Sequence, residues 1–158
     1  MKNQPLLLTY PLLTLQDTQK LASFLAPLLQ PTDILALTGQ LGAGKTTFTR
    51  FLIQSLAPPI DEIPSPTFTL VQTYDTPKGV LWHFDCYRLA TPFEAIELGI
   101  EDAFNSGISV IEWPEKIEPL LPSTSLFLTF DTSSSRSLKI FGDTNWKNRL
   151  CSSLTPLW

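Results

Sequence analysis

Apolar residues recur with helical spacing in two long stretches of this sequence. The first follows Thr14, a predicted helix N-cap with Asp17 three residues later, and ends before Pro31. The second begins at Lys45 and stops at Pro58. The apolar positions that share a helical face are Leu21, Phe24, Leu25, Leu28 and Leu29 in the first stretch and Phe48, Phe51, Leu52 and Leu56 in the second. Two amphipathic helices are therefore expected.

Short apolar runs between turn residues predict the strands. Ile34–Leu37 is continuously apolar and Ile108–Glu112 is mostly apolar up to its end, which is typical of strands buried on both faces of a sheet. Two antiparallel hairpins are also predicted, Phe68–Tyr74 with Val80–Asp85 and Leu126–Phe130 with Leu138–Phe141. Strands interleaved with helices indicate an α/β fold.

Further helix signals follow the first hairpin. Thr91-Pro92-Phe93-Glu94 combines an N-cap, a proline at the first helical position and a capping glutamate, so a helix is expected from there to Gly99. A second short helix is expected over Ile100–Phe104. The tail from Asp143 to Trp158 gives no clear prediction.

Composition limits the class of protein. The 158 residues, 43% hydrophobic and 16% charged, fit a single globular domain over residues 1–158. No apolar run approaches the ~18 residues that span a bilayer and no secretion signal is recognisable, so a cytoplasmic protein without a membrane partner is expected. With only Cys86 and Cys151, reduced thiols are favoured over a disulfide. The net charge of −4 indicates that any RNA is held through a protein partner.

A glycine-rich loop separates the first predicted strand from the second helix. Gly39-Gln40-Leu41-Gly42-Ala43-Gly44-Lys45-Thr46 matches the pattern G-x-x-x-x-G-K-[ST]. Its glycines allow successive backbone N–H groups to converge on a phosphate, and the helix that follows adds its positive dipole end. Lys45 would neutralise the outer phosphates, and the Thr46 hydroxyl can bind Mg²⁺. The flanking strand and helix favour this interpretation over an ordinary glycine turn.

Two carboxylates are placed at strand ends. Asp85 and Glu112 each follow an apolar run that would not tolerate a charge in its middle. A phosphate loop needs an acid near the metal and a means of positioning water, both supplied from the carboxyl ends of neighbouring strands. Asp85, Glu112 and Lys45 are therefore the candidate catalytic residues, although either acid alone would also fit a solvated strand end.

Four other polar or aromatic features have two interpretations each. Ser65-Pro66-Thr67 lies where phosphate-loop proteins carry a switch segment, and it also fits a simple turn. His83 fits a hydrogen-bonded core histidine better than a catalytic base. Trp113 is either beside the nucleotide or an ordinary core aromatic. Arg88 would contact a phosphate or a surface acid.

Together these motifs resemble the TsaE (formerly YjeE) family, the ATPase component of bacterial threonylcarbamoyladenosine synthesis on ANN-decoding tRNAs. Their order and spacing extend over most of residues 10–115. The matching segments are Leu41-Gly42-Ala43-Gly44-Lys45-Thr46-Thr47, Ser65-Pro66-Thr67-Phe68-Thr69-Leu70-Val71, His83-Phe84-Asp85-Cys86-Tyr87-Arg88-Leu89 and Ile111-Glu112-Trp113-Pro114-Glu115.

The resemblance implies a three-layer P-loop NTPase-like fold with a mixed, partly parallel central sheet and antiparallel hairpins. It implies an ATPase that acts with the TsaB and TsaD proteins in tRNA N6-threonylcarbamoyladenosine (t6A) biosynthesis, with ATP and Mg²⁺ as cofactors and tRNA reached through the complex. By analogy Thr46 and Glu112 bind Mg²⁺, Asp85 is the Walker B-like acid, residues 65–67 belong to the switch and Trp113 adjoins the nucleotide.

Two other functions stay open at this point. A small-molecule P-loop kinase has a similar loop and size, but kinases normally use lid arginines, and the four arginines here show no cluster. A GTPase is less well supported, since neither Asn-Lys-x-Asp nor Asp-x-x-Gly after a strand is present. A nucleotide-sensing binding protein without useful turnover would use Thr46, Asp85 and Glu112 equally well.

Overall fold

The central element is a seven-stranded mixed sheet, seen in a computed structural model that describes residues 3–153. The strand order is β1-β7-β6-β2-β5-β4-β3. β2 pairs in parallel with both β5 and β6, and β4 pairs in parallel with β5, whereas the β1–β7, β6–β7 and β3–β4 pairs are antiparallel. The strands are β1 (Leu6–Pro11), β2 (Ile34–Gly39), β3 (Val71–Thr76), β4 (Gly79–Asp85), β5 (Ile108–Glu112), β6 (Leu126–Asp131) and β7 (Ser137–Phe141).

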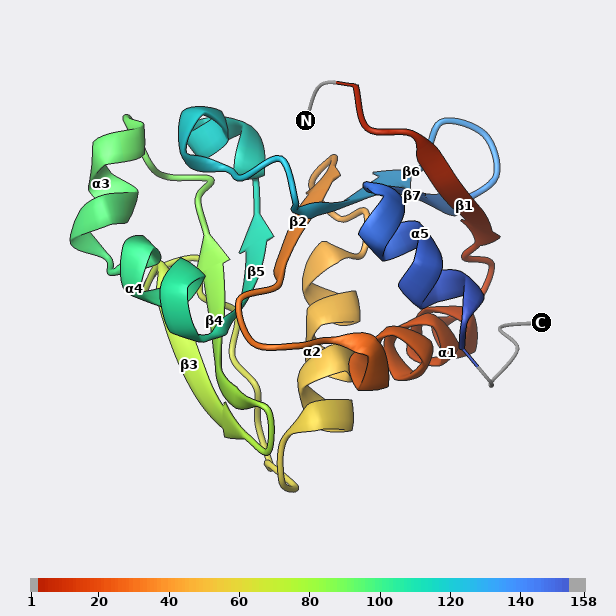
Figure 1. The fold of residues 1–158 in the computed structure, drawn as a ribbon, viewed down its shortest axis with the longest axis horizontal. Helices are drawn as coiled ribbons and strands as arrows, with labels where there is room; N and C mark the ends of the chain where they lie inside the picture. The colour runs from red at the N-terminus through yellow and green to blue at the C-terminus, as the bar shows by residue number, and fades with distance from the viewer. Residues whose placement is uncertain (1–2, 154–158) are drawn as a thin grey trace.

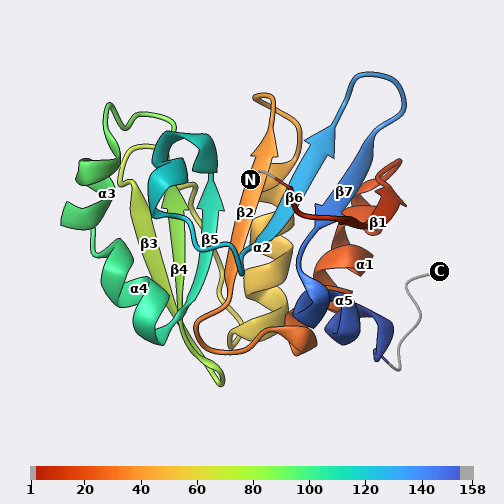
Figure 2. The ribbon, with the colours of Figure 1, turned by 45° about the horizontal axis from the view of Figure 1, so that its top comes forward.

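Helices cover both faces of the sheet and complete three layers (Figure 1). On one face, α1 (Leu15–Leu25) and α2 (Lys45–Leu56) form the larger core with the sheet, and α5 (Thr144–Cys151) joins it through Trp146. On the other face, α3 (Pro92–Glu97), α4 (Ile100–Ser106) and the 3₁₀ segment η2 (Pro114–Leu120) form a second core beside β4 and β5 (Figure 2). The expected mixed-sheet α/β architecture is confirmed. Among the described residues no helix is long and apolar enough to cross a membrane.

The helices begin where their capping residues predict. Thr14 caps α1, because its hydroxyl accepts a hydrogen bond from the Asp17 N–H while the Asp17 carboxylate accepts one from the Thr14 N–H. Thr91 and Glu94 form the same reciprocal arrangement at the start of α3. Gly99, with a φ of 89°, separates α3 from α4 as expected.

The sequence prediction places the start of β3 too early. It was expected from Phe68, but β3 begins at Val71. Residues 68–70 form a turn in which Leu70 has a φ of 71° and donates its N–H to the Pro66 carbonyl. The apolar character of this segment is therefore not a strand signal, since Phe68 is 83% exposed.

Two elements near the ends of the chain were not predicted. β1 is an edge strand whose hydrogen-bonding partner β7 lies 130 residues further along the chain, as in the pair Thr9 and Lys139. α5 lies within the tail for which no prediction was made, and Asp143 caps it by accepting the Trp146 N–H. Residues 154–158 of that tail lie outside the described residues.

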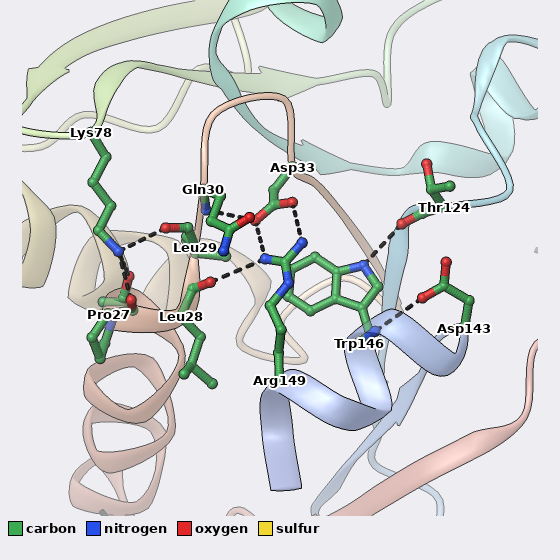
Figure 3. A network of polar contacts seen from close by, with 11 residues as sticks. Pro27, Leu28, Leu29, Gln30, Asp33, Lys78, Thr124, Asp143, Trp146 and Arg149 are labelled. Carbon is green, nitrogen blue, oxygen red and sulfur yellow. Dashed lines mark hydrogen bonds and ion pairs between the residues drawn. The ribbon is translucent and has the colours of Figure 1, made fainter. Parts of the chain in front are cut away.

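α5 is joined to the rest of the fold by a largely buried ion pair (Figure 3). The two guanidinium nitrogens of Arg149 donate to the two carboxylate oxygens of Asp33 at 2.6 and 2.8 Å. Arg149 also donates to the Leu28 carbonyl at 3.0 Å, and its guanidinium lies 4.0 Å from the ring centroid of Trp146. This helix therefore contacts the start of β2 and the 3₁₀ segment η1 (Ala26–Leu28).

Lys78, in the β3–β4 turn, contacts the same part of the molecule from the other side (Figure 3). Its ammonium donates to the carbonyls of Pro27 and Leu29 at 2.6 and 2.7 Å. These carbonyls end the α1–η1 segment, where a cation is favoured by the helix dipole. Partial burial lowers the pKa of Lys78, an effect opposed by Asp33.

Candidate functional site

The glycine-rich loop connects the end of β2 to the start of α2, as its motif requires. Gly39 has a φ of 149°, and a Cβ there would lie 2.9 Å from the Phe130 carbonyl oxygen of the neighbouring strand. Gly44, the N-cap of α2, has a φ of 109°. Side chains at either position would strain the backbone, so the two glycines that bound the motif are needed for the loop to adopt this path.

Lys45 lies inside the loop. Its ammonium donates to the carbonyls of Gly39 and Gln40 at 2.6 and 2.9 Å and lies 4.2 Å from the ring centroid of Trp113. Burial lowers the pKa of Lys45, and the nearby carboxylate of Glu112 acts in the opposite direction. A buried ammonium here is positioned to meet anionic oxygens that enter the loop.

The two strand-end acids are neighbours. Because β4 and β5 run in parallel and in register, Asp85 pairs with Glu112 at the carboxyl edge of the sheet. Both side chains are almost fully buried, with 5% of Asp85 and 2% of Glu112 exposed. This burial excludes the alternative of two solvated strand ends.

Glu112 is held at both carboxylate oxygens. The Thr46 hydroxyl donates to Oε1 at 2.7 Å, and His83 Nε2 lies 2.6 Å from Oε2. His83 is fully buried, which confirms that it is a hydrogen-bonded core histidine. Its partner is one of the candidate catalytic acids.

Asp85 contacts the predicted switch segment. Its Oδ2 accepts the Thr67 hydroxyl at 3.1 Å, and its Oδ1 accepts the Tyr87 N–H at 3.0 Å. The hydroxyls of Ser65 and Thr67 lie 2.8 Å apart. A change in the position of residues 65–67 would therefore alter the hydrogen bonding of the Asp85 carboxylate.

A cavity of about 180 Å³ brings most of these groups together. Its walls combine the phosphate loop, the first residues of α2, the switch threonine and the two acids. The lining residues are Leu41, Gly42, Ala43, Gly44, Lys45, Thr46, Thr47, Thr67, Asp85, Glu112 and Trp113. Of the candidate site residues, Gly39 and Gln40 lie behind the cavity and contribute the carbonyls that hold Lys45.

Trp113 forms one wall of this cavity. It follows Glu112 with a φ of 59°, which turns the chain sharply at the end of β5. Its ring is partly exposed, and its centroid is 4.8 Å from that of Tyr87. The ring therefore combines packing against the core with a face toward Lys45.

A second cavity, of about 330 Å³, lies on the other side of the loop. It is lined by residues 12–15, Thr18, residues 42–44, Thr47 and Arg136. The Arg136 guanidinium donates to the Gly42 carbonyl at 3.0 Å. Arg136 belongs to the β6–β7 loop, and nothing in its local sequence links it to the phosphate loop. Sequence reasoning therefore missed it.

The Arg88 guanidinium carbon lies 5.3 Å from the ring centroid of Phe68, and its contact with a phosphate stays a prediction. Cys86 is 1% exposed and Cys151 is exposed, and both are free thiols. Neither cysteine lines either cavity.

The oxygen pair of Thr46 and Glu112 fits a magnesium ion. The hydroxyl and carboxylate oxygens are 2.7 Å apart, close to the separation of about 3 Å between adjacent ligands of an octahedral ion with bonds of 2.0–2.1 Å. Within the described part of the chain no cluster of three or more His, Cys, Asp or Glu residues is arranged to bind a metal alone. Mg²⁺ suits such a site, since it is usually held by one or two protein oxygens together with substrate phosphates and water.

Comparisons with known proteins agree with this geometry. The family model described as "Threonylcarbamoyl adenosine biosynthesis protein TsaE" matches residues 12–139. A relative from Rickettsia felis, named tRNA threonylcarbamoyladenosine biosynthesis protein TsaE, is 48% identical over 106 residues, which are 67% of this chain and 62% of that protein. A relative of the same name from Haemophilus influenzae is 38% identical over 121 residues, 75% of this chain and 76% of that protein.

The fold has a solved counterpart. The crystal structure of YdiB from Bacillus subtilis matches it with a TM-score of 0.71 and 28% sequence identity, covering 96% of this chain and 95% of that one. The family match includes the whole phosphate loop, the switch segment and both strand-end acids. From the sequence match, the fold and the composition of the site together, we conclude that this chain belongs to the TsaE family of threonylcarbamoyladenosine biosynthesis proteins.

Proposed function

We propose that this protein binds Mg-ATP in the cavity at the phosphate loop and hydrolyses it, in support of t6A modification of tRNA together with TsaB and TsaD. The observation that carries the proposal is the convergence of Lys45, the Thr46–Glu112 oxygen pair and Asp85 on one cavity. A loop that only turned the chain would not need two buried carboxylates beside it.

The phosphate-binding part of the proposal concerns the loop. Its backbone N–H groups and the N-terminus of α2 would hold the phosphates, and Lys45 would neutralise the outer ones. Thr46 and Glu112 would hold Mg²⁺, which neutralises charge on the β- and γ-phosphates when it is bound. The second cavity, on the far side of residues 42–44, leaves room for the nucleoside.

The hydrolytic part concerns the acids. β5 lies between β4 and β2, the strand that leads into the loop. Asp85, at the end of β4, would orient the attacking water or its hydrogen-bonding network. Its contact with Thr67 would make its position depend on residues 65–67. A lost γ-phosphate could then be signalled to the surface through this segment.

The cellular part rests on the family. The relatives are named for t6A biosynthesis, and the matched segment spans 62% of the Rickettsia felis protein's length. With a net charge of −4, the chain would reach tRNA through TsaB and TsaD, in the cytoplasm, rather than bind it alone.

The proposal is tested by comparing nucleotide binding with single-turnover ADP formation, with TsaB and TsaD present. Glu112→Ala and Asp85→Ala are expected to lower the rate of ADP formation more than the affinity for ATP, because both groups would act on the metal or the attacking water rather than on most of the ligand. Steady-state ADP release by the wild-type protein, with and without partners, accompanies the test.

The outcomes separate hydrolysis from sensing. Wild-type rates in both folded variants would remove the catalytic roles of the two acids. Tight ATP binding without ADP release under any condition would favour a nucleotide sensor, a reading that the Thr67–Asp85 contact also accommodates.

A further inference from the structure

His83 is a polar residue in an apolar position. It lies in β4 on the face that packs toward α2, between Leu81 and Asp85, and none of its surface is exposed. Burying an imidazole costs free energy unless its nitrogens are hydrogen-bonded. Nε2 is bonded to Glu112, but Nδ1 has no partner among the described residues. The side chain therefore makes one short hydrogen bond, and its second nitrogen is buried without a partner among the described residues.

The chemistry of the two groups gives the direction of that contact. A carboxylate oxygen accepts, so the Nε2–H of His83 donates to Oε2 of Glu112. The bond at 2.6 Å is short, as expected for a carboxylate acceptor. His83 thus binds the oxygen of Glu112 that faces away from Thr46.

The two contacts to Glu112 are complementary. A glutamate side chain has several rotatable bonds, and a contact at only one oxygen leaves the other free to turn. Thr46 at Oε1 and His83 at Oε2 together fix the plane of the carboxylate. The oxygen that faces Thr46 is also the one proposed to bind Mg²⁺, so its position depends on the histidine behind it.

We propose that His83 is a positioning residue that orients Glu112 for Mg²⁺. This inference rests on the proposed function, because it gives His83 a role only if Glu112 binds the metal. His83 does not line the cavity, so the proposal gives it no direct contact with the nucleotide. It acts through the carboxylate, and a neutral side chain that donates from the same place should replace it.

The test uses two amides of equal polarity. The Nε2 of glutamine can reach the position of the histidine Nε2, whereas asparagine is one methylene shorter and cannot reach Glu112. His83→Gln should therefore keep the function that His83→Asn loses. His83→Leu removes the donor altogether and serves as the apolar variant. Thermal unfolding establishes which variants are folded.

The measurement is the gain in ADP affinity that Mg²⁺ provides, obtained by calorimetry in Mg²⁺ and in EDTA. Affinity in EDTA should be the same in all folded variants, because the loop that holds the phosphates is intact. The gain from Mg²⁺ should fall about 10–100-fold in His83→Asn and His83→Leu and persist in His83→Gln. Electron paramagnetic resonance of Mn²⁺ with ADP gives an independent readout of the metal.

Glu112→Ala separates this inference from the function on which it rests. If the wild-type protein gains no affinity from Mg²⁺, the proposed function fails. If the gain is lost in Glu112→Ala but kept in His83→Asn and His83→Leu, the metal site stands and the role of His83 is overturned. Equal losses in His83→Gln and His83→Asn also overturn it. Adding His83→Leu to Glu112→Ala should cause no further loss of the gain, since the histidine acts through that carboxylate.

Discussion

Lys45 is almost entirely buried, yet its ammonium has its strongest contacts with carbonyls of its own loop. A bound phosphate would offer it charged acceptors in place of neutral ones. We therefore expect Lys45→Ala to weaken ATP binding by roughly ten- to 150-fold, the equivalent of about 1.5–3 kcal/mol for one charge-assisted contact. Isothermal calorimetry measures this, with the exposed Lys147→Ala as the control. Equal ATP affinity in the two folded variants would exclude phosphate binding by the loop.

The two cysteines should differ sharply in reactivity. Burial raises the pKa of the Cys86 thiol to about 12, with Asp85 adding to the effect, whereas Cys151 is exposed. The thiolate is the form that reacts, and at pH 8 almost none is present at Cys86. Iodoacetamide should therefore modify one thiol per native chain, at Cys151, and two after unfolding. Mass spectrometry counts them, and rapid native labelling of Cys86 would contradict the buried position of that strand end.

At the level of the site, sequence reasoning found what is local and missed what only the sheet brings together. The phosphate loop was recognisable because its eight residues are contiguous. Asp85 and Glu112 were recognisable because each ends an apolar run. The contact between His83 and Glu112, by contrast, depends on the parallel pairing of β4 with β5, and that of Arg136 with Gly42 depends on a loop 94 residues away.

The helices and strands that depend on local signals were also predicted, and those that depend on distant contacts were not. The starts of α1 and α3 were predicted correctly because their capping boxes span four residues, but α1 ends at Leu25, before the expected end near Pro31. α5 has an N-cap but a short apolar stripe, and its contacts with Asp33 come from Arg149, 116 residues away. The start of β3 was predicted wrongly because apolar composition does not separate a strand from the exposed turn at residues 68–70.

The attachment of α5 should make a measurable contribution to stability. Arg149→Met removes the partner of a nearly buried carboxylate, and leaving such a charge unpaired costs about 3 kcal/mol or more. Lys139→Met is the matched control, because the Lys139–Asp131 pair is 3.6 Å apart and partly exposed, and such pairs contribute about 1 kcal/mol at most. Urea denaturation gives the free energies of unfolding. Equal losses in the two variants would show that the buried pair contributes no more than a surface one.

For the whole molecule, the family predicts a role in the cell. Depleting this protein should lower t6A in ANN-decoding tRNAs, and a Thr46→Ala copy should fail to restore it because the proposed phosphate and Mg²⁺ site is impaired. Mass spectrometry of nucleosides from the depleted cells measures the modification, and a wild-type copy is the control. Normal t6A after complete depletion would leave the nucleotide site without its proposed purpose and return the kinase and sensor interpretations.

The pairing of β1 with β7 has a consequence for synthesis of the chain. Residues 6–11 leave the ribosome well before residues 137–141, their strand partner within the described part of the chain. β6, the other neighbour of β7 in the sheet, is also made after β2 to β5. The β1 segment must therefore wait for this pairing until residues 137–141 have been made, and the sheet closes at that edge only after the phosphate loop and both strand-end acids have been synthesised.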